Sequence, residues 1–253
     1  MTRSPRIPLV LCLAALASSP AAQGTTYQET IPGTMVRFEM VAVPGGGDGI
    51  EPGVDPFYLG RTEVTWDMYD VFALGLDQKT AEGEADAVAR PSRPYGAPDY
   101  GWGHAGYPAI SIAREAADAF AAWLSSVTGR PYRLPTEAEW EHAARLAAEG
   151  ADRDAVAWHQ GNASRRTHPV ASLKPDALGV FDLFGNAAEW VVTADGARVT
   201  RGGSFRDPID RVGPEARAVQ SDSWNERDPQ LPKSRWWLSD GPFVGFRLAR
   251  SIE

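Results

Sequence analysis

The first third of the chain changes from an alternating hydrophobic pattern to a helical one. Residues 35–41 (MVRFEMV) alternate apolar and polar side chains with the two-residue period of a half-buried strand. Residues 56–60 (PFYLG) favour a second strand, and Thr65 is a suitable N-cap for a short helix that continues through Leu74. The pattern therefore predicts two strands followed by one short helix.

The clearest helical periodicity lies in the middle of the chain. Between Ala116 and Val127 the apolar residues recur every three or four positions, and Gly129 supplies a C-terminal stop. A second helix start follows, because Thr136 and Glu139 have the spacing of a capping box, which satisfies two main-chain donors and contributes about 1 kcal/mol. We expect two helices here.

Two polar segments lack a regular period. Residues 75–107 are rich in Pro and Gly and contain Arg and aromatic side chains, which suit either a ligand rim or a surface excursion. Residues 223–240 mix tryptophans with Arg, Asn and Asp, a combination found both in recognition pockets and in aromatic cores held by ion pairs. The sequence leaves both alternatives open for each segment.

The N-terminus has the composition of a secretory signal peptide over residues 1–22. A basic start with Arg3 and Arg6 precedes a short apolar run and a small-residue cleavage zone at 17–22. The apolar run is too short to span a bilayer, so membrane insertion is not expected. We predict an exported protein, periplasmic or secreted, with a single domain over residues 30–252.

Charge and cysteine content restrict the chemistry of the remaining chain. Removal of the leader leaves 23 basic and 33 acidic residues, a net charge of −10, which disfavours nucleic acid and anionic membranes as partners. The one cysteine of the sequence, Cys12, lies inside the leader. After cleavage we therefore expect no disulfide, no thiolate metal ligand and no thiol nucleophile.

One segment, residues 181–190 (FDLFGNAAEW), has the composition of a cation-binding loop. Asp182 and Glu189 are seven residues apart, Gly185 lies between them, and large apolar residues flank them. Carboxylates, together with main-chain carbonyls exposed by a glycine turn, are the oxygen ligands that Ca²⁺ prefers. The same pattern also suits an ordinary solvated turn.

Several motifs together resemble the formylglycine-generating enzyme (sulfatase-modifying factor) family. They occur in family order between about residues 35 and 250: 57–65 (FYLGRTEVT), 133–141 (RLPTEAEWE), 182–190 (DLFGNAAEW), 201–205 (RGGSF) and 245–248 (GFRL). The resemblance implies a mixed α+β fold related to C-type lectins, with little regular secondary structure. The acids at the start of the 137–141 helix and the Glu63 of the first motif are expected to serve the scaffold.

The resemblance also implies one structural calcium ion. By matched position, its ligands are the side chains of Asp182 and Glu189 and the main-chain carbonyls of Gly185 and Ala187. The family's second calcium site has no matching set of oxygen ligands in residues 157–179.

Copper is not expected, because the family's two copper-binding cysteines are replaced. They match Asp207 and Val212, and neither residue can substitute for a thiolate on Cu(I). The four histidines form no recognisable ligand motif. We therefore predict that the chain does not make formylglycine by the family's copper route.

A ligand pocket is predicted around Ser204, Arg206, Asp207, Trp224 and Trp236. The leading hypothesis is an exported, calcium-stabilised module that binds a ligand or a protein partner there. The second hypothesis is a periplasmic oxidoreductase, analogous to the family member of pyoverdine maturation, in which Arg206 and Asp207 position the substrate and move protons. A third hypothesis is carbohydrate binding at a lectin-like surface.

Overall fold

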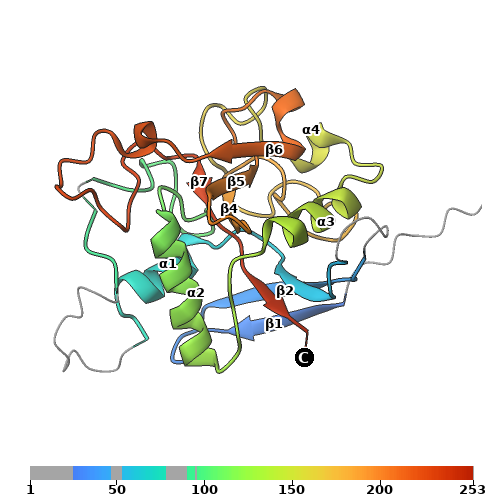
Figure 1. The fold of residues 1–253 in the computed structure, drawn as a ribbon, viewed down its shortest axis with the longest axis horizontal. Helices are drawn as coiled ribbons and strands as arrows, with labels where there is room; N and C mark the ends of the chain where they lie inside the picture. The colour runs from blue at the N-terminus through green and yellow to red at the C-terminus, as the bar shows by residue number, and fades with distance from the viewer. Residues whose placement is uncertain (1–24, 47–52, 78–89, 95, 253) are drawn as a thin grey trace, which may run out of the picture.

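The computed structural model describes residues 25–46, 53–77, 90–94 and 96–252 (Figure 1). The signal peptide predicted at 1–22 and Cys12 lie outside these residues and stay predictions. Within the described part of the chain, no helix has the length and apolar character needed to cross a membrane.

The first sheet joins the two ends of the described chain. Its strands pair antiparallel in the order β1-β2-β3-β8, so the last strand lies beside the third. Both strands predicted from the alternating pattern are present, the first shifted by two residues, whereas β1 and β8 were not predicted. The strands are β1 (Thr26–Thr30), β2 (Arg37–Val43), β3 (Phe57–Gly60) and β8 (Ala249–Ser251).

The second sheet adjoins a cavity. Its order is β6-β5-β4-β7, with β4 and β7 parallel and the other pairs antiparallel. The strands are β4 (Ala188–Val192), β5 (Arg198–Gly202), β6 (Gly213–Val219) and β7 (Val244–Gly245). The segment 181–190, predicted as a loop, is therefore a loop only up to its entry into β4. Its strand half shows no alternation because residues 188–191 are all buried.

Four helices and two short 3₁₀ turns complete the described fold. The helices are α1 (Trp66–Ala73), α2 (Arg114–Thr128), α3 (Glu137–Ala147) and α4 (Arg153–Val156). The 3₁₀ turns are η1 (Ile209–Arg211) and η2 (Asp222–Asn225). Figure 1 shows α2 on the side of the first sheet, and α3 close to both sheets.

The local signals for these helices are confirmed. Thr65 is the N-cap of α1, and Gly129 ends α2 in the left-handed conformation with φ 71°. Both hydrogen bonds of the capping box between Thr136 and Glu139 are formed at α3. Local chemistry therefore sets the end of α2 and the start of α3, whereas the Thr65 side chain forms no capping hydrogen bond at α1.

Aromatic rings connect the N-terminal helices with the C-terminal strands. The Phe120 ring lies 5.7 Å from the Tyr69 ring and 5.4 Å from the Phe246 ring, measured between centroids. All three side chains are fully buried, and the burial of each stabilises the folded state by roughly 1.5–3 kcal/mol. This packing brings the 245–248 motif into the centre of the molecule.

Candidate functional site

The proposed calcium loop enters β4 through a strained turn. Asp182, Gly185 and Asn186 all have positive φ angles, of 53°, 78° and 49°. Gly185 lies against the backbone of Trp158, where a Cβ atom would clash. The turn therefore requires glycine at this position, and Asn and Asp are the residues that best tolerate the other two.

Glu189 forms a fully buried ion pair with Arg247. Its Oε1 accepts from Arg247 Nε at 2.9 Å and Nη2 at 2.7 Å, while its Oε2 accepts from the Trp140 indole at 2.9 Å. Arg247 also donates to the carbonyl oxygens of Gly60 at 2.7 Å and Phe181 at 2.8 Å. One guanidinium thus joins the end of β3, the loop and β4.

Two further buried carboxylates face the same loop. Glu63 accepts from the Asn186 side chain at 3.0 Å and from the Ala187 main-chain N–H at 2.9 Å. Asp182 accepts from Ala171 N–H at 2.7 Å through Oδ2, whereas its buried Oδ1 has no hydrogen-bond partner in the described chain. The expectation that Glu63 packs internally as scaffold is confirmed.

The buried charges in this region do not balance. Three carboxylates, Glu63, Asp182 and Glu189, surround the single guanidinium of Arg247. Burial and the neighbouring carboxylates raise the pKa of Glu63 well above its usual value, and burial raises the pKa of Asp182 to about 6. Either protons or a cation must offset part of this negative charge.

The donor set fits a hard cation at Asp182 more fully than at Glu189. Asp182 Oδ1 is a buried oxygen free to ligate, and the excess negative charge would be reduced by a divalent ion. Both oxygens of Glu189 already accept from Arg247 or Trp140, so Glu189 could contribute only a remaining lone pair. Gly185 and Ala187 would supply main-chain carbonyls, as the family resemblance implies.

The predicted ligand pocket corresponds in part to a cavity of about 530 Å³ beside β6. Arg206, Asp207 and Trp224 line this cavity, and Val212, which matches the second copper-binding cysteine of the family, lines it too. We call it the β6 cavity. Three of the five predicted pocket residues are therefore brought together.

Ser204 and Trp236 do not line the β6 cavity, which corrects the prediction. Ser204 is fully buried, and both its N–H and its hydroxyl donate to Asp207 Oδ2, at 2.8 and 2.7 Å. Trp236 is buried in the core near Phe72, with 6.5 Å between ring centroids. Asp207 thus has a structural role as well, because it closes the turn after β5.

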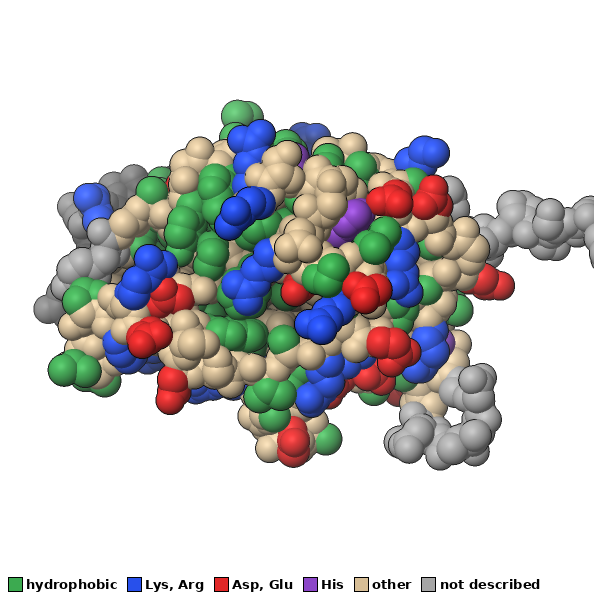
Figure 2. Space-filling view, turned by 90° about the horizontal axis from the view of Figure 1, so that it is seen from above, with side chains coloured by type: hydrophobic (Ala, Val, Ile, Leu, Met, Phe, Trp, Pro, Cys, Tyr) green, Lys and Arg blue, Asp and Glu red, His purple; other side chains and the backbone are tan. Residues whose placement is uncertain are grey.

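Arg206 lies at the rim of the β6 cavity over an aromatic ring. Its guanidinium carbon is 3.1 Å from the centroid of the Phe243 ring, and the Phe243 ring in turn packs edge-on against Trp224 at 5.0 Å. Partial burial lowers the pKa of Arg206. The face of the molecule over β6 carries many Lys and Arg side chains, with acidic side chains between them (Figure 2).

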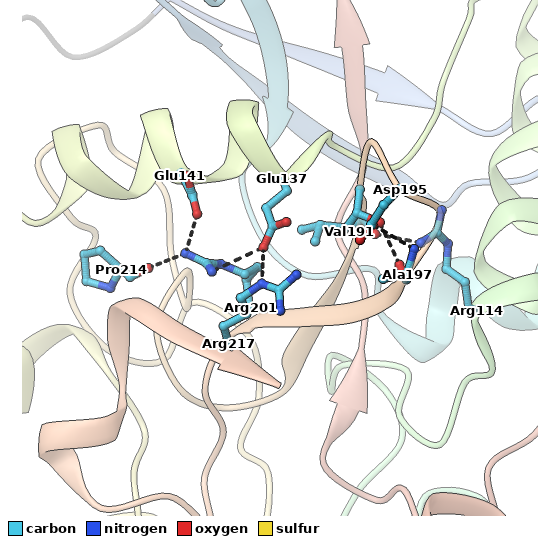
Figure 3. Close-up of polar contacts among 10 residues, drawn as sticks. Arg114, Glu137, Glu141, Val191, Asp195, Ala197, Arg201, Pro214 and Arg217 are labelled. Carbon is cyan, nitrogen blue, oxygen red and sulfur yellow. Dashed lines mark hydrogen bonds and ion pairs between the residues drawn. The ribbon is translucent and has the colours of Figure 1, made fainter. Parts of the chain in front are cut away.

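An ion-pair network between α3 and the second sheet supports the wall of this cavity (Figure 3). Arg201 contacts Glu137 at 3.3 Å and Glu141 at 3.0 Å and donates to the Pro214 carbonyl at 2.7 Å. Arg217, which lines the cavity, pairs with the same Glu137 at 2.7 Å. The acids at the start of α3 are therefore structural, as predicted.

The described parts of the 75–107 segment pack against the 223–240 segment. Tyr100 donates to the Ser239 carbonyl at 2.8 Å, and the Trp237 indole donates to the Ser92 carbonyl at 2.8 Å. A second cavity of about 300 Å³ lies between the two segments. The sequence identified both segments but gave no sign that they meet, because the contacts join residues more than 130 positions apart.

The four histidines have separate partners. His104 lies between Asp70 and Asp99 at 2.7 and 2.9 Å, and these hydrogen bonds raise its pKa although burial opposes them. The other three contact different groups: His142 the Pro44 carbonyl, His159 the Asp154 carboxylate and His168 the Ala163 carbonyl. No three such side chains or carboxylates converge on a metal position within the described residues.

The fold and the site together define an α+β protein with an arginine-lined cavity beside β6 and a buried carboxylate cluster around Arg247. A sequence model of the sulfatase-modifying factor enzyme 1-like domain matches residues 38–252. The chain therefore belongs to the sulfatase-modifying factor (formylglycine-generating enzyme) family.

The curated relatives match only part of the chain. The formylglycine-generating enzyme of Mycobacterium tuberculosis is 34% identical over 112 residues, which cover 35% of this chain and 34% of that protein. Chaperone protein LppX of Paenibacillus barcinonensis is 34% identical over 84 residues, which cover 23% of this chain and 30% of that protein. The chain thus spans about a third of the length of these relatives.

Solved structures match nearly the whole chain. PvdO from Pseudomonas aeruginosa aligns with a TM-score of 0.62 and 26% identity, covering 93% of this chain and all of that one. Treponema denticola variable protein 1 aligns with a TM-score of 0.60 and 21% identity, covering 90% of this chain and 99% of that one. At this identity the match indicates the fold alone.

Proposed function

We propose that this protein is an exported, calcium-stabilised member of its family that binds a ligand in the β6 cavity and does not make formylglycine. The main support for this proposal is the identity of two residues in the cavity wall. Asp207 and Val212 occupy the matched positions of the copper-binding cysteines, and both line the cavity.

Neither residue can hold Cu(I) as a thiolate would. Cu(I) prefers soft sulfur ligands, whereas a carboxylate is hard and a valine offers no ligand atom. Asp207 is further restricted, because one of its oxygens already accepts two hydrogen bonds from Ser204. The cavity therefore contains the positions matched to the family's copper ligands but lacks their thiolates, which supports ligand binding without copper chemistry.

Export to the periplasm or outside the cell is part of the proposal and rests on the composition of residues 1–22. The calcium ion is proposed at Asp182, Gly185, Ala187 and Glu189 and would neutralise part of the buried negative charge. Sugar binding through this ion is disfavoured, since the Asp182 and Glu189 side chains are only 2% and 0% exposed.

A second candidate is an oxidoreductase whose altered site acts on another substrate. The match to PvdO over 93% of this chain, at 26% identity, favours it. In such an enzyme, Arg206 would bind the substrate, and the Asp207 oxygen that Ser204 does not occupy could accept a proton.

The proposal predicts no formylglycine from a sulfatase-type cysteine peptide. The purified protein is incubated with Cu(I), O₂, a thiol reductant and the peptide, and the products are identified by mass spectrometry. We expect the same peptide masses as in a protein-free control, while the Mycobacterium tuberculosis formylglycine-generating enzyme, assayed in parallel, converts the peptide. Conversion above the protein-free control would contradict the proposal.

A further inference from the structure

The lining of the β6 cavity indicates the chemical class of its ligand, an inference that rests on the proposed function. Arg153, Arg206 and Arg211 line the cavity, and none of them forms an ion pair within the described residues. A fourth, Arg217, is already paired with Glu137 outside the cavity. Four arginines thus gather at one cavity in a chain whose formal net charge is −8.

The acidic side chains of the lining are Asp207, Asp210 and Glu215, equal in number to the three arginines that form no ion pair in the described part of the chain. An anion site is therefore supported by the free N–H groups of these arginines and not by an excess of charge. Asp207 Oδ2 is held by Ser204, and Asp210 and Glu215 form no ion pair with the described arginines. The cavity therefore offers guanidinium groups that form no ion pair within the described residues, although the charge of the neighbouring Asp207 acts on Arg206.

Arg206 is the donor best prepared to bind an anion. Its guanidinium lies over the Phe243 ring at 3.1 Å, a contact that fixes the cation and occupies its face. The N–H groups at the edge of the guanidinium find no acceptor among the described residues and can donate to a ligand. A guanidinium edge matches the paired oxygens of a carboxylate or phosphate in a bidentate arrangement.

An aromatic floor adjoins this donor. Trp224 and Phe243 both line the cavity and contact each other at 5.0 Å between ring centroids. The volume of about 530 Å³ lies within the range of small-molecule sites. A ligand that fills the space can therefore place an apolar group on the aromatic floor while its anionic group reaches Arg206.

We propose that the β6 cavity binds small molecules that carry an oxyanion, a carboxylate or a phosphate, next to an apolar ring or chain. The oxyanion pairs with the free edge of Arg206, and the apolar group packs against Trp224 and Phe243. Arg153 and Arg211 add positive charge around the same space.

Three probes test this proposal: phenylacetate, phenyl phosphate and the neutral 2-phenylethanol. Affinities are measured by titration calorimetry, and the site of binding is checked by the NMR signal of the Trp224 indole. We expect the anions to bind at least about tenfold more tightly than the alcohol, because a charge-assisted bidentate pair is lost with the alcohol. The tighter of the two anions identifies the preferred oxyanion.

Substitution isolates the role of Arg206. Arg206→Met keeps an apolar contact with Phe243 and should weaken both anions by at least about tenfold without changing alcohol binding. Arg166→Met, at an exposed arginine with no side-chain partner in the described residues, should leave all three affinities unchanged. Unchanged thermal melting of both variants would show that the fold is intact.

Two results would overturn the inference. Equal affinity for the alcohol and the anions, with a shifted Trp224 signal, would refute anion recognition but leave a ligand-binding cavity. Tight anion binding that survives Arg206→Met would refute the assignment to Arg206. If no probe shifts the Trp224 signal, both the inference and ligand binding at this cavity fail, whereas the absence of formylglycine activity is judged by its own assay.

Discussion

Replacing Arg247 with methionine is expected to lower the free energy of unfolding by about 3–5 kcal/mol. The substitution removes the only guanidinium that contacts Glu189 among the described residues and leaves a carboxylate unpaired in a fully buried position. It also leaves the carbonyl oxygens of Gly60 and Phe181 without their donor. Thermal unfolding should show a decrease in Tm of roughly 10 °C for a domain of this size.

A matched control separates burial from charge. Arg61 also pairs with a carboxylate, Glu39, but the Arg61 side chain is 33% exposed. Arg61→Met should therefore lower the free energy of unfolding by less than about 1 kcal/mol. In the double variant Glu189→Leu/Arg247→Met the decrease in the free energy of unfolding should be smaller than the sum of the two single decreases, since the Glu189 carboxylate is no longer left buried without its partner. A decrease in the free energy of unfolding of less than about 1 kcal/mol for Arg247→Met alone would refute the structural role of the Glu189–Arg247 pair.

Calcium is expected to raise the Tm of the protein, and Asp182→Ala is expected to abolish this increase. A free calcium concentration one hundred times the dissociation constant would stabilise the native state by about 2.7 kcal/mol. Asp182 is the best position to test because its Oδ1 has no protein partner in the described chain, whereas Glu189→Gln would also disturb the ion pair with Arg247. The measurement compares melting in calcium with melting in EGTA.

The comparison removes effects unrelated to calcium. Alanine at Asp182 destabilises by itself, since its φ of 53° is unfavourable for alanine, but that cost is the same in both buffers. Asp195 is a suitable control, because it is an exposed acid that accepts from the Ala197 N–H and is not among the residues with an unpaired buried oxygen. Asp195→Ala should keep the calcium increment. Identical melting of the parent protein in calcium and EGTA would eliminate the proposed site.

The sequence predicted the elements whose ends depend on neighbouring residues. The capping box of Thr136 and Glu139, the glycine stop at Gly129 and the strand before Gly60 all follow from short-range chemistry. The interior position of Glu63 was also predicted, although only through the family resemblance. These features need no knowledge of which segments meet in space.

The arrangement of the site depended on contacts that no local pattern encodes. Glu189 meets Arg247 across 58 residues, and β4 pairs with the two-residue strand β7, too short to leave a signal. The pocket prediction failed at Ser204 and Trp236 because position in a motif does not tell whether a side chain faces a cavity or the core. Arg153 and Arg217 were missed for the same reason, since each reaches the β6 cavity from a different segment.

The metal content of the native protein tests the central claim most directly. The protein is purified from the exported fraction without chelator and analysed for calcium, copper and iron. We expect about one calcium per chain and neither copper nor iron in stoichiometric amount. Stoichiometric copper or iron would contradict it, because the histidines and carboxylates of the chain would then hold a redox centre and the oxidoreductase candidate would take precedence.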